Sequence, residues 1–334
     1  MQTPSVAILG ATGLVGRTMA KILEERDFPV GELRPLASAR SAGTTMHFRG
    51  REFTIQEATP DAFRGVDLVL SSAGASVSRA LLPAAAAHGA VSIDNTSAFR
   101  MEPDIPLVVP EVNPHRISEY GERRIIANPN CSTIQLVVAL KPLHEAFGVK
   151  RVITSTYQSV SGAGQAAVDE LRRTTGDVLA GGSGETDVFP STIAFNAVPH
   201  IDVFMPDDDT REEWKMRVET KKIMEAEIPL HATCVRVPVL EAHSEAVWVE
   251  TERPVSPREA RGLWASSPGL AVVDEPATGR YPTALDAAGR DEVLVGRVRV
   301  DPTIENGLAF WVVADNLRKG AALNAIQIAE RLVS

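Results

Sequence analysis

The chain has 334 residues, a length that suggests about two domains. Hydrophobic residues make up 44% of it and charged residues 23%, which is typical of a globular protein rather than a disordered one. The formal net charge of -9 gives a surface that repels phosphate backbones, so we expect no nucleic-acid partner. No apolar run approaches the roughly 20 residues that span a bilayer, so we expect no membrane-spanning segment.

The cysteines and the first residues bear on the cellular compartment. Cys131 and Cys234 are too few for a disulfide framework, and reduced thiols suit a reducing environment. The start, MQTPSVAILG, lacks the basic region and the cleavage pattern of a signal peptide. The sequence therefore predicts a cytoplasmic protein.

The first 127 residues alternate short apolar strands with helices. SVAILGATGLVGRTMAKILEE indicates a buried strand, a glycine turn and an amphipathic helix. Further strands are expected in ELRPLAS, VDLVLSSA, AVSIDN, PLVVPE and RIIANP, and a helix in SVSRALLPAAAAHG despite Pro83. This alternation predicts an α/β, doubly wound Rossmann-type domain with a parallel sheet over residues 1–127.

Residues 128–315 have longer strands, several of which alternate apolar and polar side chains. KRVITSTYQSV, ATCVRVPVL, AVWVETE, EVLVGRVRV and LAFWVVAD predict a mostly antiparallel sheet with one covered face, in an α+β domain. SPREARGLWAS predicts a helix with Ser256 as N-cap, Pro257 in the first turn and Glu259 completing a capping box. TTGDVLAGGSGETD and MPDDDTREE predict surface loops. We expect a C-terminal helix over residues 316–334 to complete the first domain.

The motif GATGLVG follows the first strand and opens the first helix. Gly10 permits a tight turn, Gly13 lets the backbone approach a pyrophosphate, and Gly16 allows close packing of helix and strand. The helix start adds N–H groups and a positive dipole end. The candidate cofactor contacts in this turn are Gly10, Thr12, Gly13, Leu14, Val15 and Gly16. Glycines also end strands for structural reasons alone, but the position in a βαβ pattern favours dinucleotide binding.

The end of the second strand bears on which dinucleotide binds. Sites selective for NAD usually place an acid there, about 20 residues after the glycines, to bind the ribose hydroxyls. Here the chain reads LASARSAG, with no acid but with Arg40 and Ser41, whose guanidinium and hydroxyl suit a 2′-phosphate. We therefore favour NADP, the alternative being that Arg40 is a solvated loop residue.

The segment NPNCSTIQ places Cys131 between a proline-containing turn and an apolar helix. A cysteine there can be a small buried hydrophobe, or a reactive thiolate among the unpaired N–H groups of a helix start. Beside a nicotinamide, a thiolate can attack a carbonyl carbon and carry the acyl group as a thioester. CVRVPVLEAHSEAVWVE adds Arg236 on a strand and His243 just past the end of that strand, the latter suited to acid/base work.

Eight segments together resemble the aspartate-semialdehyde dehydrogenase family. They are GATGLVG, LASARSAG, NTSAFR, NPNCSTIQ, YQSVSGAG, NAVPHID, EEWKMRVETKKI and RVPVLEAHSEAV, in that family's order and over nearly the whole chain. The bacterial branch with short, NADP-using chains is the most similar. The resemblance implies NADPH-dependent reductive dephosphorylation of L-aspartyl 4-phosphate to L-aspartate 4-semialdehyde and phosphate, in lysine, diaminopimelate, threonine and methionine biosynthesis. It also implies a homodimer formed through the second domain.

The resemblance also implies roles for single residues. Cys131 is the expected nucleophile and His243 the acid/base, which takes the thiol proton and later protonates the hemiacetal oxygen. The substrate-binding residues are Gln158, Arg236 for the α-carboxylate and Glu219 for the α-amino group. Phosphate is expected at Arg100 and Lys222, with Lys215 as a rival for Lys222. Ser161, Gly162 and Asn316 are expected to line the cofactor, and no metal is implied. Ala242 stands where the family's pattern has glycine before the histidine.

Three alternative functions are also compatible with the sequence. An N-acetylglutamyl-phosphate reductase shares the architecture and the thioester chemistry, but its substrate has a blocked amine. A related acyl-CoA reductase uses a different acyl group. The third is an inactive paralogue that serves as a scaffold, against which the presence of Cys131, Gln158, Arg236 and His243 counts.

Overall fold

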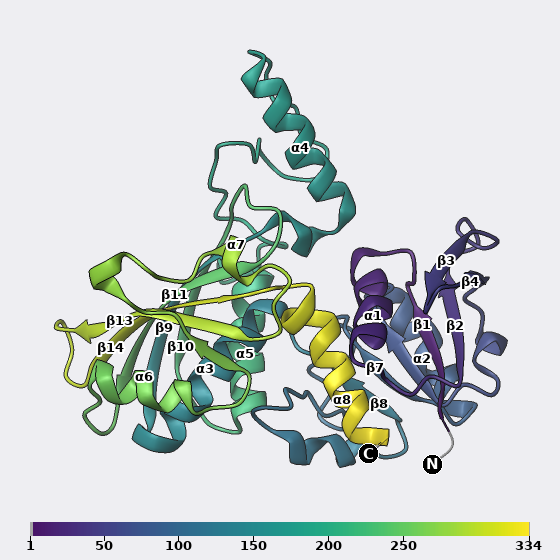
Figure 1. The fold of residues 1–334 in the computed structure, drawn as a ribbon, viewed down its shortest axis with the longest axis horizontal. Coiled ribbons are helices and arrows are strands. Elements are labelled where there is room, and N and C mark those ends of the chain that lie inside the picture. Colours follow the sequence, from purple (N-terminus) through teal and green to yellow (C-terminus); the bar gives the residue numbers. More distant parts are fainter. Residues whose placement is uncertain (1–2, 334) are drawn as a thin grey trace. The chain divides into compact units, whose positions relative to one another are not determined.

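The computed structural model describes residues 3–333, and the chain divides into two compact units (Figure 1). The first unit comprises Met1–Asn130 with Ala321–Ser334, and the second comprises Cys131–Gly320. The C-terminal segment therefore joins the first unit at Ala321, whereas Asn316 belongs to the second unit.

The first unit contains a parallel sheet with the strand order β5-β2-β1-β6-β7-β8, as predicted for a doubly wound domain. The strands are β1 (Ser5–Leu9), β2 (Glu32–Ala37), β5 (Gln56–Glu57), β6 (Leu68–Ser71), β7 (Val91–Asp94) and β8 (Ile125–Ala127). The helices are α1 (Leu14–Glu25), α2 (Ala75–Ala87), which contains Pro83, and α8 (Leu323–Val333). Apolar side chains of α1 and α8 share one buried cluster with those of β1, so α8 is part of this unit's core.

Three details of the first unit and of the segment that leads into α8 differ from the sequence prediction. PLVVPE is not a strand: Leu107 makes only an isolated bridge to Ala127, because Pro106 and Pro110 remove N–H donors on either side. A hairpin of β3 (Thr45–Phe48) and β4 (Arg51–Thr54) was not expected, and its turn uses Arg49 and Gly50, both with positive φ. The C-terminal helix starts as a π-helical turn, Arg318–Ala322, and becomes α8 only at Leu323.

The second unit contains a sheet with the order β10-β9-β11-β14-β13-β12. Its strands are β9 (Val149–Gln158), β10 (Leu230–Arg236), β11 (His243–Thr251), β12 (Leu270–Val272), β13 (Val293–Asp301) and β14 (Gly307–Ala314). The pairs β9–β11, β11–β14 and β13–β14 are antiparallel, whereas β9–β10 and β12–β13 are parallel, so the sheet is mostly antiparallel as predicted.

Helices α3 (Cys131–Phe147), α5 (Arg211–Met224) and α6 (Pro257–Ala265) pack against this sheet (Figure 1). The predicted capping box of α6 is present, with Ser256 accepting from the Glu259 N–H and the Glu259 carboxylate accepting from the Ser256 N–H. The short helix α7 (Ala284–Ala287) follows in chain order. The sheet thus has a face covered by α3, α5 and α6.

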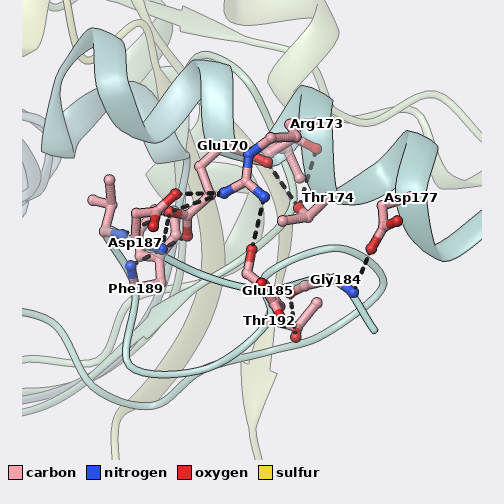
Figure 2. Close-up of polar contacts among 11 residues, drawn as sticks. Glu170, Arg173, Thr174, Asp177, Gly184, Glu185, Asp187, Phe189 and Thr192 are labelled. Atoms are coloured by element: carbon pink, nitrogen blue, oxygen red, sulfur yellow. Dashed lines mark hydrogen bonds and ion pairs between the residues drawn. The ribbon is translucent and has the colours of Figure 1, made fainter. Parts of the chain in front are cut away.

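Helix α4 (Gln165–Leu179) projects from the rest of the second unit (Figure 1). It includes the first part of TTGDVLAGGSGETD, so the surface-loop prediction was wrong there, because Val168 and Leu171 bury an apolar stripe. The buried carboxylate of Glu170 accepts backbone N–H groups of Asp187, Val188 and Phe189 at 2.7, 2.6 and 3.2 Å. Figure 2 shows these contacts, which tie the segment after α4 back to the helix.

Candidate active site

Three of the predicted site residues stand in one row across the second unit's sheet. Arg236 on β10 pairs with Gln158 on β9, and Gln158 pairs with His243 on β11. His243 does not follow the end of the Arg236 strand as predicted. The chain leaves β10 after Arg236 and returns on the other side of β9, where His243 is the first residue of β11. The topology therefore brings the two residues to either side of Gln158.

The turn into β11 explains the glycine expected at position 242. Ala242 has φ of 71°, a left-handed backbone conformation that costs a residue with a Cβ roughly 1–2 kcal/mol. Its N–H donates to Asn316 Oδ1 at 2.9 Å. The alanine therefore keeps the backbone conformation in which glycine is favoured.

His243 is fully buried, and its two ring nitrogens have different surroundings. Nδ1 accepts the backbone N–H of Ser159 at 3.0 Å, and because a backbone N–H can only donate, the neutral ring carries its proton on Nε2. Nε2 is buried and has no hydrogen-bond partner among the described residues. Burial and the charge of Arg236 lower the pKa of His243 to about 3, so the ring is neutral at pH 7. It presents an unused Nε2–H donor.

A buried network of hydroxyl and amide groups holds this orientation of His243. Ser159 Oγ lies 3.1 Å from His243 Nδ1 and 3.0 Å from Asn316 Oδ1, and the Asn316 amide nitrogen donates to Ser161 Oγ at 3.0 Å. Gly162 lies next to both Arg236 and His243: a Cβ at this position would be 3.1 Å from Arg236 Nη1 and 3.2 Å from His243 Nε2. Ser161, Gly162 and Asn316, predicted as cofactor contacts, thus surround the histidine in this unit.

Cys131 is the first residue of α3 and is half-buried, whereas Cys234 is fully buried. Burial raises the pKa of the Cys234 thiol well above its usual range, so Cys131 is the better candidate for a thiolate. Burial lowers the pKa of Arg236, while its charge interacts favourably with those of Glu212 and Cys131. The guanidinium is oriented by a 2.6 Å hydrogen bond from Nη1 to the Ser159 carbonyl.

Glu212 is a member of this cluster that the sequence prediction missed. It lies in the first turn of α5, is 4% exposed, and accepts the Gln158 amide N–H at 3.1 Å. Lys215 lies 3.1 Å from the other Glu212 oxygen and 2.7 Å from Asp202. Glu219, the predicted residue, is buried two turns further along the same helix. A signal was present, because Glu212 and Lys215 have the same spacing as Glu219 and Lys222.

In the first unit, the glycine turn borders a cavity of about 610 Å³. Its lining includes Leu9, Gly10, Thr12, Gly13, Ser38, Ala39, Glu57, Ser72, Ser76 and Val77. Gly16 fits only as glycine, since a Cβ there would lie 2.2 Å from the Gly10 carbonyl oxygen. This is the close approach of helix and strand that the motif predicts, and the cavity beside it can take part of a dinucleotide.

Three further residues near the strand ends of this unit bear on anion binding. Arg40 is exposed, and Ser41 follows it after β2. Glu57 was missed: β5 pairs with β2 so that Glu57 stands opposite Ala37, at the strand end where the sequence showed no acid. No pattern signals this, because β5 is only Gln56–Glu57.

Arg100 is buried in the first unit near the ends of β7 and β8. Its Nε donates to the Asn128 carbonyl at 3.0 Å and its Nη2 to the Asn95 carbonyl at 2.9 Å. The guanidinium is therefore fixed in orientation at the carboxyl edge of the parallel sheet, where ligands of such folds bind.

Residues 3–333 include no helix long and apolar enough to cross a membrane. In the same range, no group of three or more histidine, cysteine, aspartate or glutamate side chains is arranged to hold a metal ion.

Comparison with known proteins identifies the family. Residues 5–120 match the domain described as semialdehyde dehydrogenase, NAD binding domain, and residues 140–319 match the semialdehyde dehydrogenase dimerisation domain. An aspartate-semialdehyde dehydrogenase of Aquifex aeolicus is 54% identical over 331 residues, which cover 98% of this chain and 97% of the relative. The chain belongs to the aspartate-semialdehyde dehydrogenase family.

Solved structures of aspartate-semialdehyde dehydrogenases agree with this membership. The Vibrio cholerae enzyme II, complexed with ASA, superimposes with a TM-score of 0.97 at 50% identity and covers 100% of this chain and 99% of that one. The Candida albicans enzyme with NADP has a TM-score of 0.76 at 28% identity, and 98% of each chain is covered. These structures confirm the predicted α/β fold, and the match to the NAD binding domain confirms the predicted use of a nicotinamide cofactor.

Proposed function

We propose that the chain catalyses the NADPH-dependent reductive dephosphorylation of L-aspartyl 4-phosphate to L-aspartate 4-semialdehyde and phosphate. The observation that carries this proposal is the row of Arg236, Gln158 and His243, together with the interaction of Arg236 with Cys131 at the start of α3. The row supplies a carboxylate-binding guanidinium and a neutral hydrogen-bond donor, and α3 supplies the thiol.

Cys131 would be the nucleophile. Its sulfur attacks the acyl-phosphate carbon, the C–O bond to phosphate breaks, and an acyl thioester remains on the protein. The helix start and the nearby Arg236 charge both favour the thiolate. NADPH, when bound, supplies the hydride that reduces this thioester to the aldehyde level, after which the carbon–sulfur bond breaks and the thiolate returns.

His243 would act as a hydrogen-bond donor to the carbonyl oxygen rather than as a base for the thiol. Its Nδ1 already accepts from Ser159, and its pKa of about 3 makes it a weak base. Its Nε2–H can instead donate to the carbonyl oxygen as negative charge builds there. We therefore propose a hydrogen-bonding role for His243 in place of the predicted acid/base role, and assign the ionisation of Cys131 to its surroundings.

The substrate's α-carboxylate suits Arg236, whose planar guanidinium can make two parallel hydrogen bonds. For the α-amino group, the contact of Glu212 with Gln158 supports Glu212 over the predicted Glu219. The pairing of Lys215 with Glu212 likewise supports Lys215 over Lys222 for phosphate. Arg100 remains a candidate for phosphate from the resemblance.

The Glu212 carboxylate also bears on the choice among related reactions. A free α-ammonium group gains from a buried carboxylate, whereas an N-acetylated amine carries no charge to pair with it. Phosphate-dependent reduction of NADP should therefore be fast with aspartate semialdehyde and slow with N-acetylglutamate semialdehyde. Faster turnover of the acetylated substrate, or a requirement for coenzyme A in place of phosphate, would reject the proposal.

The covalent step has a direct test. Cys131→Ala should abolish turnover while leaving the fold and NADP binding intact, because Cys234 is buried and cannot replace the thiol. Circular dichroism and NADP titration of the variant serve as controls. Normal turnover in this variant would remove the covalent mechanism.

NADP is proposed over NAD on the basis of Arg40 and Ser41. Arg40→Ala should weaken NADPH binding by about 1–3 kcal/mol, the scale of a lost charge-assisted hydrogen bond, and should affect NADH little. Glu57→Gln should have the opposite effect and weaken NADH binding more than NADPH binding, because a carboxylate on β5, opposite the end of β2, would favour ribose hydroxyls over a phosphate. Unchanged cofactor preference in Arg40→Ala would show that Arg40 is a surface residue.

A homodimer is proposed through the second unit. The sheet face that bears Tyr157 and Trp311, whose rings lie 5.4 Å apart, also includes the half-buried Trp248. Aromatic side chains of this kind are typical of protein interfaces. Light scattering at micromolar concentration should give about twice the mass of one chain. A single species of 35.9 kDa would contradict this.

A further inference from the structure

Glu245 is a buried acid to which the proposed reaction gives no role. It lies on β11, is 0% exposed, and both of its carboxyl oxygens lack a hydrogen-bond partner among the described residues. The side-chain nitrogen of Gln135, which is 1% exposed, also lacks one. Buried polar groups are rarely left unpaired, so these two side chains require an explanation.

The position of Glu245 connects it to both reacting groups. Side chains two residues apart on a strand share a face. Glu245 therefore points to the same side of the sheet as His243, two residues further along β11. On α3, Gln135 lies one turn after Cys131 and therefore on the same helix face. Because α3 packs against β11, the Gln135 amide lies beside the Glu245 carboxyl, one layer below Cys131 and His243.

The surroundings of Glu245 disfavour a charged carboxylate. Burial raises its pKa well above the ordinary value, the adjacent Gln135 amide opposes this, and the charge of Glu212 from α5 raises it further. Cys234 from β10, whose own pKa burial raises, offers no positive charge. His243 on the same strand is neutral at pH 7, and the cation Arg236 is in register with His243 rather than with Glu245.

We propose that Glu245 works as a neutral carboxylic acid that pairs with the Gln135 side chain and thereby positions Cys131 against His243. The carboxyl O–H donates to the Gln135 carbonyl oxygen, and the carboxyl carbonyl accepts from the Gln135 nitrogen. Small rotations about the terminal torsions, which are soft in both side chains, bring the two groups into this arrangement. Glu245 is thus a positioning residue, and only the identity of the reaction it serves rests on the proposed function.

The variants separate charge, hydrogen bonding and packing. Glu245→Gln keeps the size and the neutral donor and acceptor, whereas Glu245→Met and Gln135→Met keep only the length. Val247→Ala is the matched control, because it opens a cavity on the same face of β11, two residues further from His243 than Glu245 is. The readouts are the alkylation rate of Cys131 by iodoacetamide against pH, with Cys131→Ala as background, and kcat and KM for the semialdehyde.

We expect Glu245→Gln to keep both kcat and the pH midpoint of alkylation. Each methionine variant should lower kcat about tenfold with little change in KM, since displacing a catalytic group by up to 1 Å costs as much as 100-fold. The double variant should be no worse than either single one, because both remove the same pair. The pH midpoint of Cys131 alkylation should be higher in the methionine variants than in the wild type, and it should be unchanged in Val247→Ala.

Two results would overturn the proposal. If Glu245→Gln were as impaired as Glu245→Met, or lowered the pH midpoint of alkylation, the carboxylate would be ionised in the protein. If the methionine variants behaved like Val247→Ala, the two side chains would merely fill space. The alkylation readout needs no substrate, so it decides the matter even if aspartate semialdehyde is not turned over.

Discussion

The protonation of Glu245 predicts an unusual dependence of stability on pH. A group whose pKa is higher in the folded state than in the unfolded chain favours folding below its unfolded value. As the pH rises above that value, the unfolded chain loses the proton while the folded protein keeps it, and stability falls. Replacing Glu245 with glutamine removes this term, so the variant should gain stability relative to the wild type as the pH increases.

The magnitude follows from the ordinary glutamate value of 4.5. Each pH unit above it costs the wild type about 1.4 kcal/mol for as long as the folded protein holds the proton. While the folded protein holds the proton, the term is below about 1 kcal/mol at pH 5 and grows to about 3 kcal/mol by pH 7. A change in packing from the new amide shifts the variant's free energy of unfolding by the same amount at all pH values. The slope of the free energy of unfolding against pH is therefore the diagnostic quantity.

Urea unfolding of the wild type and Glu245→Gln at pH 5, 6, 7 and 8 measures this slope. Protein concentration is held constant, because association of subunits would otherwise change the apparent stability. Glu292→Gln removes an exposed carboxylate from the same unit. Its free energy of unfolding, plotted against pH, should run parallel to that of the wild type. Parallel curves for Glu245→Gln as well would refute the reasoning, because they would show that Glu245 releases its proton in the folded protein at an ordinary pH.

Other substitutions test the remaining groups. His243→Asn should lower kcat by about 10²–10⁴ at every pH from 5 to 8, because the pKa of about 3 leaves the ring neutral throughout; a loss confined to one side of pH 6.5 would contradict this. Arg236→Lys should mainly raise KM, by about 10–100-fold, since lysine cannot fork onto a carboxylate; a change in kcat alone would point elsewhere. Gly162→Ala should lower kcat/KM about tenfold with the fold intact, because the new methyl group crowds Arg236 and His243. Full activity would show that these two side chains can move aside without loss of function. Glu212→Gln should weaken substrate binding more than Glu219→Gln does, and the reverse order would restore the original assignment.

The fold could be predicted where each element has its own local signal. The first strand and helix, the capping box at Ser256 and the long strands of the second unit all show their period or their caps in the sequence. The failures have equally local causes. The run between Pro106 and Pro110 is apolar enough for a strand but lacks the donors to pair as one, and β5 is too short to show any period.

The candidate site was less predictable because it depends on register between strands. Cys131, Gln158, Arg236 and His243 could be named from motifs, yet their alignment across β10, β9 and β11 follows from pairings that no segment contains. Glu212 and Glu219 show the same limit within one helix: both precede a lysine by three residues and both are buried. The contact with Gln158, made by Glu212, distinguishes them only after the helix has been placed on the sheet.

Burial also changed the chemistry that residue types alone suggested. A histidine with an ordinary pKa of 6.5 suits a base near neutral pH, and a glutamate with an ordinary pKa of 4.5 suits a carboxylate. On the covered face of this sheet, burial shifts both toward their neutral forms, in opposite directions along the pH scale. Arg236 and Glu212 then carry the charges next to Gln158, opposite in sign like the carboxylate and ammonium of an amino acid. A charged His243 or Glu245 would disturb that complementarity, so their neutrality is a condition for recognising a substrate that carries both charges.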